Sequence, residues 1–105
     1  YPFVRAVARR FPGMAGLYFD AHLDVRDTPG SGMTFRRLAT ECGIRSLHLH
    51  GHRPLVNARD HLAAFRALGG RLHPDGSPVR LPRARALFVS LDLDVLDAAH
   101  APGVS

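Results

Sequence analysis

The sequence is poor in cysteine and has no long apolar run, and both absences limit what the chain can be. Cys42 is the only cysteine, so no internal disulfide can form and we expect a cytoplasmic protein. No apolar stretch approaches the roughly 20 residues needed to cross a bilayer. The segment YPFVRAVARRF interleaves arginines with apolar side chains, unlike a secretory signal. We therefore expect a soluble domain without a membrane partner.

Lysine is absent as well, because all 14 basic residues are arginines, and the net charge is +5. A basic chain attracts nucleic acid through general electrostatics. The arginines are scattered along the chain, however, and no basic strip with interleaved aromatic side chains accompanies them. We therefore expect no nucleic-acid partner.

Amphipathic helices alternate with short apolar strands over the 105 residues, the length of one domain. Helical spacing of apolar side chains predicts helices over residues 2–11, 35–42 and 57–68, and short apolar runs predict strands over 15–19, 44–51, 71–73 and 86–92. This order predicts an α/β domain with a mostly parallel sheet. Residues 74–85 contain three prolines, so we expect there an irregular surface excursion or the place of a lost helix.

Two acidic clusters follow two of the predicted strands. FDAHLD places Asp20, His22 and Asp24 after one strand, and SLDLDVLD places Asp92 and Asp94 after another. Residues two apart in an extended chain point to one face, and parallel sheets bind ligands at the carboxyl ends of their strands. We therefore expect the five side chains to meet at one edge of the sheet.

Such a meeting has a chemical consequence. Carboxylates crowded about 4 Å apart repel by several kcal/mol at an intermediate dielectric, and a cation removes that cost. Four carboxylates with an imidazole favour an ion such as Mn²⁺ and have room for two ions that share oxygens. The alternative is that these aspartates only cap a helix or close a turn. We favour the metal because the pattern occurs after two separate strands.

The same motifs resemble a known family. FDAHLD together with SLDLDVLDAAHAPG is similar to two signature motifs of the ureohydrolase superfamily, which comprises arginases, agmatinases and formimidoylglutamases. The segment DVRDTPGSGMTFRRL resembles the formimidoylglutamase branch, whereas arginases have a Ser-Gly-Asn-Leu-His-Gly type of loop there. The resemblance covers essentially the whole chain.

The resemblance implies a three-layer α/β/α fold with a parallel sheet and a centre of two Mn²⁺ ions. It implies hydrolysis of a linear C–N bond in a small amidino, formimino or guanidino substrate by a metal-bridging hydroxide. A formimidoylglutamase-like activity is the nearest match, with agmatinase or arginase activity as the alternative. By motif position Asp20 and Asp92 would bridge both ions, Asp24 would complete one shell, and His22 and Asp94 would complete the other. Asp24 would also bond to the bridging water, which makes it the candidate catalytic residue.

The sequence departs from the family pattern before its first predicted helix. The resemblance implies a histidine ligand in a Gly-Gly-Asp-His segment before the helix that begins near Tyr1, and this sequence has no such segment. One ion would then lack a protein ligand. We interpret the chain as a partial or shortened member of the family, with a non-catalytic chain that holds at most one ion as the alternative. Open sheet edges would favour a homo-oligomer.

Three residues are candidates for contact with the substrate. In the family, the region that matches GHRPLVNARDH lines the substrate pocket, so Arg53 and Asn57 could hold a substrate carboxylate. Ser31 either caps a helix or contacts the substrate, and we favour the cap.

Three histidines alternate in LHLHGH, namely His48, His50 and His52. This spacing fits a one-sided row of metal ligands, and it equally fits a strand whose imidazoles bond to their neighbours. We favour the second interpretation.

Overall fold

The structure, a computed structural model, describes residues 1–26, 33–53, 59–96, 99–100 and 103. Its elements, in chain order, are α1 (Pro2–Arg10), β1 (Ala15–Phe19), α2 (Thr34–Cys42), β2 (Leu47–His50), α3 (Arg59–Ala67), β3 (Gly70–His73), β4 (Leu87–Leu91) and a 3-10 turn (Leu93–Val95). Within these ranges, no helix combines the length and the apolar character that a membrane crossing requires.

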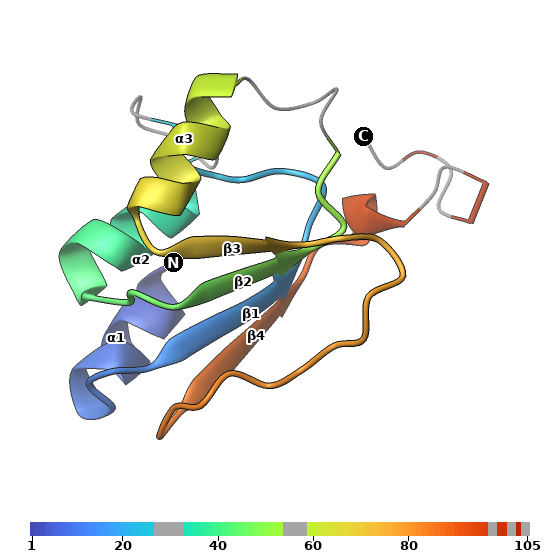
Figure 1. The fold of residues 1–105 in the computed structure, drawn as a ribbon. Helices are drawn as coiled ribbons and strands as arrows, with labels where there is room; N and C mark the ends of the chain where they lie inside the picture. Colours follow the sequence, from blue (N-terminus) through green and yellow to red (C-terminus); the bar gives the residue numbers. More distant parts are fainter. Residues whose placement is uncertain (27–32, 54–58, 97–98, 101–102, 104–105) are drawn as a thin grey trace.

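The four strands form one parallel sheet in the order β3-β2-β1-β4. Strand β1 is central, since Gly16 pairs with Leu47 on one side and with Phe88 on the other. All four carboxyl ends therefore point to the same edge of the sheet (Figure 1). The predicted α/β class with a parallel sheet is confirmed.

The three helices lie on one face of this sheet (Figure 1). On that face the Tyr18 ring stacks on Phe35 with a centroid distance of 3.6 Å and meets Phe65 edge-on at 6.2 Å. Leu47 and Leu49 of β2 complete the same cluster and are fully buried. The second helix layer of the expected α/β/α arrangement is not formed by the described residues.

Strand β2 begins later than expected, at Leu47 instead of residue 44. The reason is the end of α2, where Gly43 adopts a left-handed conformation with φ of 67°. The amides of Gly43 and Ile44 both donate to the carbonyl of Leu38, the latter at 3.2 Å. The backbone of residue 44 thus belongs to the helix end.

The connection from β3 to β4 contains no helix, as its prolines predicted. Residues 74–86 cross from the carboxyl edge back to the start of β4 as an extended coil (Figure 1). The Val79 and Leu81 side chains on this coil are exposed, at 50% and 72%. On β4 itself, Val89 and Leu91 are 61% and 65% exposed, so the sheet face away from the helices is partly bare. The predicted homo-oligomer stays a prediction.

Close packing at Gly16 yields a stability prediction. A Cβ built there would overlap the Phe88 ring and lie 2.9 Å from Leu47 Cδ2. We expect Gly16→Ala to lower the free energy of unfolding by about 1–3 kcal/mol, measured by urea denaturation. In a Phe88→Leu background, which removes the ring, the same substitution should cost less. An equal cost in both backgrounds would show that the ring contact is not the cause.

Candidate metal centre

The parallel ladder continues for one residue beyond β1 and β4, and this brings the two acidic clusters together. The amide of Asp20 donates to the carbonyl of His50 at 3.1 Å, and the amide of Asp92 donates to the carbonyl of Phe19 at 2.9 Å. Asp20 and Asp92 therefore leave neighbouring strands at the same edge of the sheet. The strands themselves end at Phe19 and Leu91.

Asp20, His22 and Asp94 form the centre of this edge. Each offers one ligand atom, and these atoms all lie within 4.8 Å of one another. His22 Nδ1 is 2.7 Å from Asp94 Oδ2 and 3.5 Å from Asp20 Oδ1. Asp20 and Asp94 are buried, whereas His22 is half-buried. The group is thus reachable from solvent through the imidazole side.

Backbone amides hold the two buried carboxylates in place. The amide of His22 donates to Asp20 Oδ1 at 2.8 Å, and the amide of Ala21 donates to Asp94 Oδ1 at 3.1 Å. Asp94 Oδ2 is left to face His22 Nδ1. Residues of the FDAHLD turn therefore fix a carboxylate that belongs to the other cluster.

The charge of this group is poorly compensated. Burial raises the pKa of Asp20 to about 7, opposed by the hydrogen bond from the His22 amide and reinforced by the charges of Asp24, Asp94 and Asp92. Burial also raises the pKa of Asp24, while His22 lowers it. The negative charges of Asp92 and Asp94 raise the pKa of both Asp20 and Asp24, and a cation bound among these carboxylates would offset that repulsion.

Asp24 and Asp92 lie outside the three-residue group, which among the described residues consists of Asp20, His22 and Asp94. Asp24 has a left-handed backbone with φ of 49°, and its carbonyl accepts the amides of Phe35 and Arg36 at the start of α2. Asp92 is exposed, and its Oδ1 caps the 3-10 turn by accepting the Asp94 amide at 3.0 Å.

Strand alternation does not align the ligands, because both strands stop before the first candidate ligand. The chain instead curls after each strand, which buries Asp94 and exposes Asp92. The capping alternative also applies in part, since Asp92 caps the turn and the Asp24 carbonyl contacts α2.

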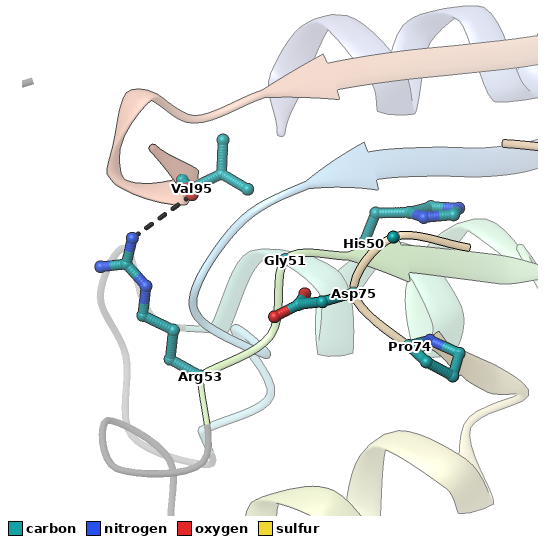
Figure 2. Close-up of a pocket in the computed structure, with 7 residues that line it drawn as sticks. His50, Gly51, Arg53, Pro74, Asp75 and Val95 are labelled. Carbon is teal, nitrogen blue, oxygen red and sulfur yellow. Dashed lines mark hydrogen bonds between the residues drawn. The ribbon is translucent and has the colours of Figure 1, made fainter. Parts of the chain in front are cut away.

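Arg53 lies beside this centre and not within it. Its guanidinium donates to the carbonyl of Leu96 at 2.6 Å and of Val95 at 3.3 Å, and so ties the segment after β2 to the turn that carries Asp94 (Figure 2). The same side chain lines a cavity of about 430 Å³, together with His50, Gly51, Pro74, Asp75, Gly76 and Val95. The other two substrate candidates, Ser31 and Asn57, lie outside the described residues.

Sequence reasoning missed Asp75 and Val95 as cavity residues and the Ala21 amide as a donor. Asp75 comes from the proline-rich coil, whose path no periodicity predicts. The glycine at position 51 was a sequence signal for close packing near this cavity. Its φ of 93° and the close approach of the Val95 side chain both require a residue without a Cβ.

Known proteins resemble this chain in sequence and in structure, although no family model matches it. Formimidoylglutamase of Bacillus subtilis (strain 168) is 32% identical over 98% of this chain and 39% of its own length. Agmatinase of the same strain is 30% identical over 98% of this chain and 39% of its own length. Formimidoylglutamase of Aromatoleum aromaticum is 34% identical over 97% of this chain and 36% of its own length.

The crystal structure of formimidoylglutamase from Bacillus subtilis subsp. subtilis str. 168 superposes with a TM-score of 0.82 and 29% identity. The match covers 98% of this chain and 38% of that one. The chain thus spans about two fifths of the length of its relatives, at 39% for the first two. The parallel sheet, the acidic group at its carboxyl edge and these similarities together support the resemblance of this chain to the ureohydrolase superfamily.

Proposed function

We propose that this chain forms part of a manganese centre that hydrolyses a linear C–N bond in a small formimino, amidino or guanidino compound, with a formimidoylglutamase-like reaction as the nearest case. The grouping of Asp20, His22 and Asp94 at the carboxyl edge of the sheet carries this proposal. The similarity to formimidoylglutamase and agmatinase supports the class of reaction.

The donor set suits the metal. Two carboxylates and an imidazole are ligands that Mn²⁺ accepts, and no cysteine is among them. Ligand atoms about 2.1 Å from one divalent ion lie at most about 4.2 Å apart, so the observed limit of 4.8 Å requires only small shifts. When bound, Mn²⁺ supplies a Lewis acid and lowers the pKa of a coordinated water.

The proposed ligand sets divide around Asp20. Asp20, His22 and Asp94 would hold one ion, and their proximity supports that set. Asp20 and Asp92 would be shared with a second ion, and Asp24 would complete the shell of that ion. The raised pKa of Asp20, to which Asp24 and Asp92 contribute, supports their inclusion. Asp24 would also accept a proton from the attacking water, because burial raises the pKa of its carboxyl group.

The substrate would bind in the cavity beside the acidic centre, which Arg53 lines. The planar guanidinium of Arg53 would bind a substrate carboxylate by a bidentate contact. Ser31 and Asn57 remain proposed contacts on the basis of motif position alone.

A non-catalytic chain that binds at most one ion is the second candidate. It is favoured by the fact that, among the described residues, three side chains rather than five form the compact group. The number of ions bound per chain separates the two candidates.

Calorimetric titration with Mn²⁺ tests the ligand assignment. We expect two ions per chain, no binding to Asp92→Ala because it removes a shared ligand, and weakened binding of one ion to Asp94→Ala. Asp60→Ala, on the exposed start of α3, is the matched control and should bind like the parent. Stoichiometry of one or zero in the parent supports the non-catalytic chain. Equal and mild effects of the two centre substitutions would contradict shared ligation by Asp92.

Stability of the metal-free protein tests the electrostatic cost of the centre. Because the folded-state pKa of Asp20 is raised to about 7, its ionisation destabilises the fold progressively from pH about 4 to pH about 7. Asp20→Asn should therefore raise the free energy of unfolding at pH 8 by about 1 kcal/mol or more and should have little effect at pH 3.5. Asp60→Asn is again the control.

This difference is measured by chemical denaturation at both pH values in the presence of a chelator. A loss of stability in Asp20→Asn at pH 8, or an equal gain at both pH values, would contradict the stated cause. Asp20→Asn should also lose Mn²⁺ binding. That loss would show that the carboxylate which destabilises the metal-free fold is also a metal ligand.

A further inference from the structure

Three histidines gather on the sheet face opposite the helices. His48 and His50 alternate on β2 with Leu47 and Leu49, which belong to the core beneath the helices. Side chains alternate between the faces of a strand, so the two imidazoles point to the other face. His73 of β3 pairs with His50 in the register and shares that face.

The three imidazoles contact one another directly. His48 Nδ1 lies 2.9 Å from His73 Nε2. The rings of His50 and His73 stack in parallel, with centroids 4.5 Å apart and an interplanar angle of 6°. His48 and His50 are each 8% exposed. These contacts agree with the favoured interpretation of the sequence, in which the strand imidazoles bond to their neighbours.

One nitrogen in the cluster has no partner. His50 Nε2 is buried and makes no hydrogen bond within the part of the chain that the structure describes. A buried polar atom without a partner is unfavourable, because it has lost its hydrogen bonds to water. The cluster thus holds an unused ligand atom beside a pair of nitrogens already in contact.

We propose that His48, His50 and His73 form a binding site for a borderline transition-metal ion such as Zn²⁺, separate from the acidic centre. In a tetrahedral site with Zn–N bonds of about 2.0–2.1 Å, two ligand nitrogens lie about 3.3–3.4 Å apart. The nitrogens of His48 and His73 need to separate by only a few tenths of an ångström from their 2.9 Å contact. Rotation of the His50 ring would bring the third nitrogen to the ion.

The surroundings suit such an ion. Burial and the neighbouring His73 lower the pKa values of His48 and His50, which favours the neutral imidazole that binds a metal. With the ion on Nδ1 of His48, the ring proton resides on Nε2, where Ser46 Oγ lies 3.1 Å away and can accept it. An outer hydrogen bond of this kind orients a histidine ligand.

An ion can also reach the cluster and complete its shell. His50 lines the cavity of about 430 Å³ seen in Figure 2, and His73 lines a neighbouring cavity of about 410 Å³. Both cavities share Pro74 and Asp75. A water from this space would fill the fourth position that three protein ligands leave open.

Ligand chemistry separates this site from the acidic centre. A set of three nitrogens favours Zn²⁺, Cu²⁺ or Ni²⁺, whereas carboxylates with one imidazole suit Mn²⁺. The inference does not depend on the proposed hydrolase activity, because it uses none of the acidic residues.

The test uses Zn²⁺ and the imidazole nitrogens of the purified protein, observed by ¹⁵N NMR in an Asp20→Asn/Asp94→Asn background that disables the acidic centre. We expect one equivalent of Zn²⁺ to shift the ring resonances of His48, His50 and His73 and to leave those of His61 and His100 in place. Absence of shifts at saturating Zn²⁺, or shifts spread evenly over all the histidines, would overturn the proposal.

Calorimetry with substituted proteins provides the second measurement. Loss of an outer-shell partner costs about 10–100-fold in metal affinity, so loss of a direct ligand in His73→Gln should weaken Zn²⁺ binding at least tenfold. His100→Gln, at an exposed position away from the cluster, is the matched control and should not weaken it. Circular dichroism verifies that both variants fold. Equal affinity of the two folded variants would contradict ligation by His73.

Discussion

Two hydrogen bonds just beyond the strands hold the acidic edge together, from Asp20 to the His50 carbonyl and from Asp92 to the Phe19 carbonyl. The first bond extends the ladder between β1 and β2 by one residue, and the second extends the ladder between β1 and β4. The segments after β1 and β4 therefore leave the sheet at the same edge. Central strand β1 is itself fixed by the buried aromatic packing around Tyr18. A packed core on one face thus determines where charged side chains meet at the edge.

This arrangement is costly for the metal-free protein. Asp20 and Asp94 are buried, and the backbone amides that they accept satisfy only part of their hydrogen-bonding capacity. Burial, reinforced by the charges of Asp24, Asp94 and Asp92, raises the pKa of Asp20 to about 7. A ligand that binds only the folded state stabilises it in proportion to its concentration and affinity. The proposed metal binding would therefore be coupled to stability through the same residues.

Much of the fold could be predicted from the sequence, because the helices and strands are short and their signals agree. The strand AGLYF matches β1 in both bounds, and Gly43 ends α2 as expected. The gathering of acidic residues at one edge also followed from the parallel order of the strands. The different burial of Asp92 and Asp94 could not be predicted, because a curl after β4 creates it and the two residues look alike in the sequence.

The histidine cluster illustrates a different limit. The alternation of His48 and His50 was visible in the sequence, but His73 lies on another strand, and only the register between β2 and β3 brings it to them. The third member of the cluster therefore came from tertiary structure, whereas the sequence had offered His52 as the third member of the row. The two candidate sites differ in ligand type, and this difference makes them experimentally separable.

The most direct test of the central claim is anomalous X-ray diffraction at the manganese edge from crystals of the protein grown with Mn²⁺. The account predicts an anomalous peak among Asp20 Oδ1, His22 Nδ1 and Asp94 Oδ2, with a second peak shared by Asp20 and Asp92. A significant anomalous signal elsewhere in the crystal with no peak at this edge of the sheet, or no peak at all at saturating Mn²⁺, would contradict the proposed metal centre.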